Sequence, residues 1–189
     1  FNQKQVGGYT YDPAKAMHLI GKAGYPGGKG LPPITLTTNA SYLDLCKFIQ
    51  SQLGEIGINL KIDVTPPATL REMIAQSKVS FFRGSWIADY PDAENYLSLF
   101  HTPNFCPAGP NYTHFSSATF DKIYDESMQE SNDSVRGLKY MQMDRLLMEE
   151  APVVILYYDQ VLRFSQKNIS GLGSNPLNLL NLKHVKKTK

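Results

Sequence analysis

The sequence lacks the features by which several classes of protein are recognised. It contains no run of about 18 apolar residues, the length that a membrane-spanning helix needs. Lysine and arginine number 19 against 17 acidic residues, and this balance argues against a nucleic-acid partner. The one basic cluster, residues 183–189, is interpreted as a solvated tail. A hydrophobic share of 42% with 19% charged residues is typical of a globular domain.

Cysteine is scarce, with Cys46 and Cys106 as the only two in the sequence. Two cysteines cannot form a disulfide framework. Cys46 falls on the apolar face of an expected helix, where a small buried thiol is common. A bridge between Cys46 and Cys106 in an oxidising compartment remains open as an alternative.

Motifs for metal binding and catalysis are also missing. His101 and His114 match no zinc spacing, and no Gly-x-Ser-x-Gly or His-Glu-x-x-His motif is present. Residues 24–30 are rich in glycine, but they follow an expected helix, and Gly30 stands where a phosphate-binding loop has serine or threonine. We therefore expect no metal, no cofactor and no enzymatic activity.

The first half of the chain alternates between strand and helix patterns. Alternating apolar residues predict strands at 34–38 and 58–64, and apolar residues at helical spacing predict a helix at 42–56 between them. A second helix then leads to a further strand at residues 79–82. This order predicts an α/β fold whose sheet is mixed, mainly parallel and flanked by helices.

Two helix starts carry capping signals in this half. Asp12 is expected to cap a helix that has Pro13 at its first position and Gly24 just beyond its end. Ser41 and Asp44 resemble a capping box at the start of the next helix.

The second half is predicted to be mainly helical before it returns to strands. Ser117 is expected to cap one helix, and a second runs through residues 133–150 with apolar residues round most of its circumference. Apolar runs predict a buried strand at 153–158 and another strand at 161–165. Irregular segments are expected at residues 101–117, long enough to cover a ligand, and at 168–189.

Residues 81–100 hold the strongest candidate site. The predicted strand ends there, and Tyr90 before Pro91 is expected to turn the chain. Pro91 suits the first position of a short helix, with Asp92 and Glu94 in its first turn. Open α/β sheets bind ligands beyond the carboxyl ends of their strands, so a turn with carboxylates at this place suits binding.

Structural interpretations compete with functional ones for these residues. Trp86, the only tryptophan, fits a core position, and Asp89 fits a turn or cap. Arg83 fits a surface salt bridge. Asp89, Asp92 and Glu94 together fit the carboxylates of a hydrolase, although the helix start by itself explains Asp92 and Glu94.

The motif Trp86-Ile-Ala-Asp89 resembles the Trp-x-x-Asp signature of the peptide-binding family of bacterial extracytoplasmic solute receptors, family 5. These are the oligopeptide, dipeptide and nickel binding components of ABC importers. The resemblance implies that Asp89 binds the α-amino group of a ligand and that Arg83 contacts a peptide. With Trp86 and the neighbouring Tyr90, these residues form the candidate ligand-binding set. Further resemblance lies in residues 12–16, 53–58 and 151–157.

The same resemblance implies the context of the chain. Residues 1–189 are expected to be one lobe of a longer, two-lobed receptor with a periplasmic-binding-protein fold, and residues 1–11 and 166–189 to be connections or tail. The other lobe and an export signal are expected before Phe1. The expected partners are a small peptide and the membrane permease subunits of an ABC importer, with no nucleic acid, and the receptor is expected to be a monomer. It is expected in the periplasm or anchored, as a lipoprotein, on the outer face of the cytoplasmic membrane.

Other functions stay open at this point. Within the binding class, the solute can instead be an oligosaccharide or a chelated metal. Outside it, the chain can be the sensor domain of a transcription regulator or a carboxylate-dependent hydrolase.

Overall fold

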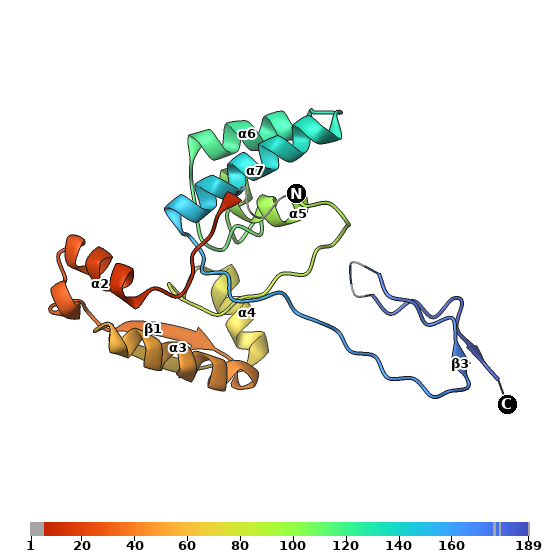
Figure 1. The fold of residues 1–189 in the computed structure, drawn as a ribbon, viewed down its shortest axis with the longest axis horizontal. Coiled ribbons are helices and arrows are strands. Elements are labelled where there is room, and N and C mark those ends of the chain that lie inside the picture. The colour runs from red at the N-terminus through yellow and green to blue at the C-terminus, as the bar shows by residue number, and fades with distance from the viewer. Residues whose placement is uncertain (1–5, 176, 178, 189) are drawn as a thin grey trace.

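A computed structural model describes residues 6–175, 177 and 179–188 of the chain (Figure 1). In Figure 1, β1 and α3 form one part of the molecule, α5, α6 and α7 form a second, and the chain after α7 runs away from both. The helices and strands are α2 (Pro13–Lys22), β1 (Ile34–Thr38), α3 (Leu43–Glu55), β2 (Leu60–Val64), α4 (Pro67–Ala75), α5 (Glu94–Leu97), α6 (Ala118–Met128), α7 (Asp133–Glu150), β3 (Ile169–Ser170) and β4 (Lys186–Lys187).

A parallel pair of strands confirms the predicted strand–helix–strand unit. β1 pairs with β2 from Ile34 opposite Leu60 to Thr38 opposite Val64, and α3 connects the two strands. The core of this unit consists of Leu36, Cys46 and Leu60, with partly buried apolar side chains of α3 and the strands packed against it. Because Cys46 is enclosed in this core, its helical face was predicted correctly.

The third predicted strand is much shorter than expected. Phe82 forms only an isolated parallel bridge with Thr37, held by hydrogen bonds from Thr37 N to Phe81 O and from Arg83 N to Thr37 O, both 3.0 Å. Gly84 follows at once, and glycine is a poor strand residue, so the pairing ends there. Phe82 nevertheless pairs beside the carboxyl end of β1, so the chain leaves the sheet where the candidate site was predicted.

The predicted start and end of α2 are correct, whereas the capping box predicted at the start of α3 is wrong. Asp12 accepts a hydrogen bond from Lys15 N (2.9 Å), and Gly24 follows the helix with φ of 93°. The capping box of Ser41 is absent. Asn39 instead accepts from Ser41 N (3.0 Å) and starts a 3-10 turn, Ala40–Tyr42, that leads into α3.

Two glycines bring the glycine-rich loop against the end of α3. Gly28 has φ of 75° and Gly57 has φ of 86°, a region that residues with a side chain avoid. A Cβ atom on Gly28 would lie 1.8 Å from the carbonyl oxygen of Gly57, so neither position has room for a side chain. The loop therefore serves backbone packing.

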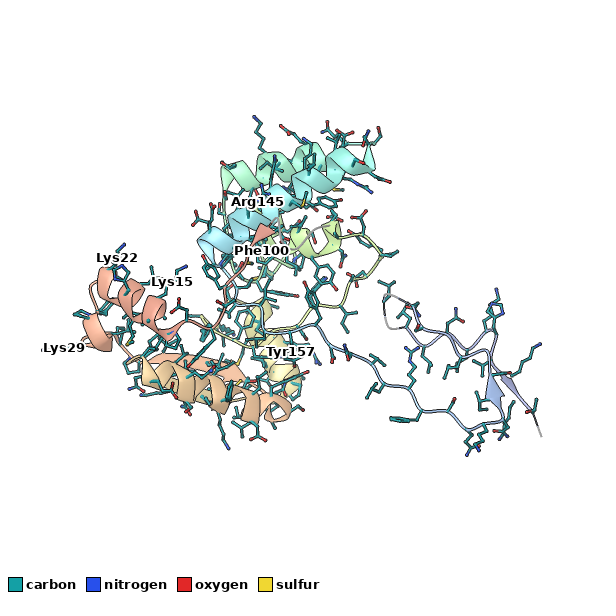
Figure 2. All side chains as sticks on the ribbon, in the orientation of Figure 1. Lys15, Lys22, Lys29, Phe100, Arg145 and Tyr157 are labelled. Carbon is teal, nitrogen blue, oxygen red and sulfur yellow. The ribbon has the colours of Figure 1, made fainter. Side chains whose placement is uncertain are left out.

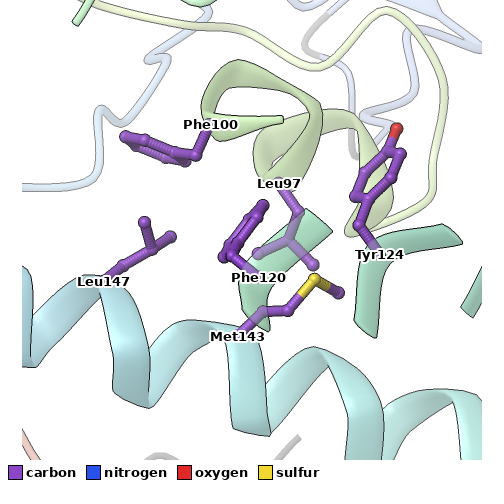
Figure 3. Close-up of a cluster of buried hydrophobic side chains, with 6 residues drawn as sticks. All are labelled: Leu97, Phe100, Phe120, Tyr124, Met143 and Leu147. Atoms are coloured by element: carbon purple, nitrogen blue, oxygen red, sulfur yellow. The ribbon is translucent and has the colours of Figure 1, made fainter. Parts of the chain in front are cut away.

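The helical part has its own core, formed by α5, α6, α7 and the 3-10 turn Ser98–Phe100 (Figure 3). Ser117 caps α6 through Phe120 N (3.3 Å), and Asn132 caps α7 through the backbone of Ser134 and Val135. Both helices were predicted, and so was the Ser117 cap, whereas the Asn132 cap was not. The buried side chains are Leu97, Phe100, Phe120, Tyr124, Met143 and Leu147.

Helix α7 is less enclosed than its sequence predicted. Met143 and Leu147 are buried, whereas Val135 and Leu138 on the same helix are 39% and 57% exposed. The expectation that α7 is covered on more than one side is therefore wrong for the part of the molecule that the structure describes.

The predicted strands at 153–158 and 161–165 do not form among the described residues. The chain there has no regular structure and leads away from the rest of the molecule beyond Tyr157 (Figure 2), and Tyr158 and Phe164 are 85% and 94% exposed. Strand-forming side chains alone cannot make a strand, because each strand needs a neighbour to pair with. Beyond this segment, β3 and β4 form a short antiparallel pair with Ile169 opposite Lys187.

Two further expectations are settled by the described residues. Cys46 and Cys106 are both free, so the alternative of a disulfide between them is wrong. Among the helices of this part of the chain, none combines the length and apolar character needed to cross a membrane.

Helix α7 provides a test of where the helical core lies. Met143→Ala is expected to lower the free energy of unfolding by about 2–5 kcal/mol, because it leaves a cavity at a fully buried site. Leu138→Ala, on the exposed side of the same helix, should change it by no more than about 0.5 kcal/mol. Urea denaturation of both variants measures the difference, and equal losses would show that the two faces of α7 are equally enclosed.

Candidate ligand-binding site

One buried amide holds the turn that contains Trp86 and Asp89. The side-chain oxygen of Asn95 accepts hydrogen bonds from Trp86 Nε1 (2.7 Å) and from the backbone N–H of Asp89 (3.1 Å). Asn95 is 3% exposed and lies on α5, so the turn is tied to the helical part of the molecule. Trp86 is half-buried, which fits both the core and the binding interpretation.

Helix α5 starts later than predicted. It begins at Glu94, three residues beyond Pro91, so Pro91 is not the first residue of the helix. Asp92 Oδ1 accepts a hydrogen bond from Glu94 N (2.9 Å) and so satisfies a backbone donor at the helix start. The predicted order of turn and helix is correct, whereas the predicted start of the helix is three residues too early.

The two carboxylates after the turn are engaged by α6, α7 and the turn itself. Glu94 is 6% exposed and accepts hydrogen bonds from the hydroxyls of Tyr90 and Tyr124. Asp92 accepts one from Tyr140 (3.0 Å) and pairs with Arg136 at 3.4 Å. These contacts explain Asp92 and Glu94 as structural residues that anchor the turn.

The tyrosines of this network stay protonated well into alkaline solution. The hydrogen bond to Glu94 raises the pKa of Tyr90 above its ordinary value. Burial raises the pKa of Tyr124, and its hydrogen bond to Glu94 adds to the effect. Burial, and then the hydrogen bond to Asp92, raises the pKa of Tyr140 to about 12. All three hydroxyls therefore remain donors to the carboxylates at neutral pH.

Asp89 differs from these two carboxylates. Its side chain is exposed, and no described residue donates a hydrogen bond to its carboxylate or forms an ion pair with it. Its backbone is fixed by Asn95 while its charge faces solvent. This combination leaves the carboxylate available to a cation from outside the chain.

Arg83 lies on the other side of Trp86, where the chain leaves β1. Its guanidinium carbon is 3.3 Å from the centroid of the Tyr42 ring, a close cation–π contact. No carboxylate of the described residues forms an ion pair with it, so the salt bridge that the sequence allowed is not found in this part of the chain. The stacking orients the guanidinium, and no hydrogen bond, ion pair or ring contact joins Arg83 to Trp86, Asp89 or Tyr90.

Two residues of this site were missed by sequence reasoning. Asn95 follows Asp89 by six residues on the expected helix, and its polar side chain amid an apolar pattern was the available signal. Tyr42 gave no signal, because it precedes Arg83 by 41 residues and meets it only through the pairing of residues 81–83 with β1.

The site is open on the surface of the chain. A hollow beside the turn is lined by Pro91 and by residues of the C-terminal segment, but by none of the four candidate residues. The loop at 101–117, expected to cover a ligand, is fixed by Asn111, whose amide donates to His101 O (3.1 Å) and Phe115 O (2.9 Å). Its role as a cover stays a prediction. In the described ranges, no three histidine, cysteine or acidic side chains form a possible metal site.

Comparison with known proteins identifies the family. Residues 1–105 match the model of bacterial extracellular solute-binding proteins, family 5, middle part, which is more than half of the chain. The chain therefore belongs to this family, as its Trp-x-x-Asp motif predicted.

Individual relatives agree with this assignment. The chain is 25% identical to the dipeptide-binding protein DppE of Bacillus subtilis over 160 residues, covering 83% of this chain and 29% of that protein. It is 23% identical to the glutathione-binding protein GsiB of Escherichia coli strain K12 over 174 residues, covering 89% of this chain and 34% of that protein. The chain thus spans about a third of the length of the curated relatives it matches.

A solved structure confirms the fold. The crystal structure of a putative peptide binding protein AppA from Clostridium difficile superposes with a TM-score of 0.83 at 21% identity, over 100% of this chain and 39% of that one. The predicted α/β fold of a periplasmic binding protein is therefore correct.

The role of Asn95 can be tested through Trp86, the only tryptophan of the chain. Asn95→Ala is expected to shift the fluorescence emission of Trp86 and to lower the free energy of unfolding by about 1–3 kcal/mol, since two donors lose their acceptor. Asn39→Ala is the control, because it removes one accepted backbone hydrogen bond near β1 and should leave the emission unchanged. An unshifted spectrum in Asn95→Ala would show that this amide does not set the position of the indole.

Proposed function

We propose that this chain is the ligand-binding lobe of a receptor that captures peptides for an ABC importer. Its membership of the solute-binding family and the names of relatives that bind dipeptides and glutathione support this function. The observation that carries it is the exposed carboxylate of Asp89, which has no partner among the described residues and lies on a turn that Asn95 holds in place.

Asp89 is proposed to bind the α-ammonium group of the peptide. A preorganised carboxylate loses little freedom when a cation binds, because its backbone is already fixed. Trp86 and Tyr90 border it on the same turn and would flank the first residue of the ligand. Neither acts through charge, so both suit peptides of many sequences.

Arg83 is proposed to contact an oxygen of the peptide. Its guanidinium carbon lies 3.3 Å from the centroid of the Tyr42 ring, and no ion pair with a described carboxylate occupies its N–H groups. A planar fork of donors matches a carboxylate or a main-chain carbonyl. Main-chain contacts of this kind do not depend on the side chains of a ligand, which suits a receptor for peptides in general.

The proposed role is binding without catalysis. Asp92 and Glu94, the carboxylates that a hydrolase would need beside Asp89, are both occupied by hydrogen bonds to tyrosines. The receptor would act as a monomer outside the cytoplasm, in the periplasm or held at the outer face of the membrane by a lipid anchor. It would deliver its ligand to the permease subunits of the importer.

Residues 1–189 are proposed to form one lobe, with a second wall of the site supplied by the rest of the receptor. The chain spans about a third of its relatives, and its candidate residues lie on an open surface. A small ligand usually has about 70–90% of its surface enclosed, which one open wall cannot provide. Closure of two lobes around the ligand would supply the remainder.

The ammonium contact is tested with an N-acetylated peptide. Asp89→Asn in the full-length receptor is expected to weaken binding of a free peptide by about 2–5 kcal/mol, because an enclosed ammonium loses its counter-charge. Acetylation of the peptide should abolish most of the affinity of the wild type and little of that of the variant. Isothermal calorimetry measures all four combinations.

The control for this experiment is Asp44→Asn. The Asp44 side chain is fully exposed on α3, so its loss changes the net charge equally without touching the turn. If acetylation proves harmless to the wild-type receptor, Asp89 is not the site of the ammonium group, whatever the variant does.

The lobe proposal is tested by comparing residues 1–189 with the full-length receptor. The lobe should melt cooperatively, since it has two hydrophobic cores, but should bind peptide with a Kd of roughly millimolar or weaker. An exposed ion pair contributes only about 0–1 kcal/mol. Calorimetry with one peptide decides the question, because equal affinities would make this chain a complete binding unit.

A further inference from the structure

A cluster of three reactive side chains lies outside the proposed ligand-binding site. Cys106 Sγ is 3.1 Å from His114 Nε2 and 3.1 Å from Ser77 Oγ, and Ser77 Oγ is 3.0 Å from His114 Nε2. Ser77 follows α4, whereas the other two belong to the loop at 101–117. The cluster therefore joins two segments that are far apart in the sequence.

The thiol lies directly beneath the surface. Cys106 is 5% exposed, while Ser77 and His114, its two partners, are both exposed. The imidazole ring is held in place by Phe105, whose ring stacks on it at 4.7 Å with an angle of 5° between the planes. A small displacement of either exposed side chain would open the sulfur to a small molecule.

The protons available in the cluster define its chemistry. His114 Nε2 either carries a hydrogen or accepts one, so the three contacts cannot all be hydrogen bonds at once. The thiol has two acceptors, His114 Nε2 at 3.1 Å and the carbonyl oxygen of Ile74 at 3.8 Å, and the imidazole nitrogen is the nearer. A chain from the Ser77 hydroxyl to Sγ, and from the thiol to Nε2, uses the protons of both groups. If the thiol proton moves to Nε2 in the course of a reaction, Ser77 and His114 both donate to the sulfur without a change in the position of any heavy atom. The cluster thus offers two hydrogen-bond donors to a thiolate formed at Cys106.

We propose that Cys106 is a site of covalent modification, where the thiolate reacts with low-molecular-weight disulfides. In this step the sulfur of Cys106 attacks one sulfur of the disulfide and forms a new S–S bond, and the other sulfur leaves as a thiolate. The proton that His114 received from the thiol passes to this leaving group. The products are a mixed disulfide at Cys106 and one free small thiol, so no further oxidant is needed.

Cys46 provides an internal comparison within the same chain. It is 0% exposed in the core between β1, β2 and α3, and no described residue forms a hydrogen bond with its thiol. A buried thiol in apolar surroundings is inert, because the thiolate is the reactive species and apolar burial disfavours it. Cys106 is therefore expected to react, and Cys46 is expected to remain unreactive.

The experiment uses bis(2-hydroxyethyl) disulfide, an uncharged reagent that does not resemble a peptide. The native full-length protein is incubated with it at pH 7, and the modified cysteines are quantified by peptide mass spectrometry over time. Cys106 is expected to react at least about tenfold faster than Cys46, since rates follow the thiolate fraction and access. Reduction with dithiothreitol should restore the thiol. If Cys106 reacts no faster than Cys46, the proposal is wrong.

Two variants distinguish the effect of the neighbouring side chains on the reactivity of Cys106 from the accessibility of its thiol. His114→Gln keeps a polar side chain over the sulfur but cannot take up its proton, and should slow modification of Cys106 by about tenfold. Ser77→Ala removes one donor and should slow it less. Both positions are exposed, so the melting temperature should stay close to that of the wild type. A rate in His114→Gln equal to or above that of the wild type would refute the role of the imidazole, and with it the proposal.

Discussion

The amide oxygen of Asn95 accepts from both the indole of Trp86 and the backbone of Asp89, and the conformation of the binding turn depends on this shared acceptor. Substitution of a buried acceptor that serves two donors is costly. Each hydrogen bond contributes about 0.5–1.5 kcal/mol net to stability, but the loss is larger when a substitution leaves the donors unpaired. The same turn is tied once more to α5, because the hydroxyl of Tyr90 donates to Glu94. Both acceptors lie on this short helix, so the conformation of the turn depends on the position of α5.

The helices α6 and α7 hold the short helix α5, which carries Asn95. Tyr124 on α6 donates to Glu94, and Tyr140 and Arg136 on α7 contact Asp92, so the short helix that carries Asn95 is held at both of its neighbouring carboxylates. A helix of four residues has little stability of its own. The core of α5, α6 and α7 thus positions the proposed binding residues through Asp92, Glu94 and Asn95.

The sequence predicted what local patterns determine and failed where distant contacts decide. Neighbouring residues alone determine the two paired strands and the helix caps. The strands at 34–38 and 60–64 were expected, the second from residue 58, and so was the cap at Asp12. The cap at Asn132 was not expected. Tyr42 under Arg83 arises only because residues 81–83 come back beside β1. The pattern at 153–158 correctly indicates strand-forming side chains, but a pattern does not supply the partner with which a strand must pair. Asp89 became a candidate through its motif, but only the structure shows that its carboxylate is exposed and has no partner among the described residues.

The exposed apolar segment at 153–165 has a consequence for how this chain behaves at high concentration. Its unpaired backbone and its large side chains, among them Tyr158 and Phe164, present a ready edge to which another extended chain can add. Proteins usually protect such edges with charge, proline or a covering element, and this segment has only Asp159 and Arg163 for that purpose. Two copies of the chain on its own would therefore tend to associate through strand addition, and self-association would rise with protein concentration.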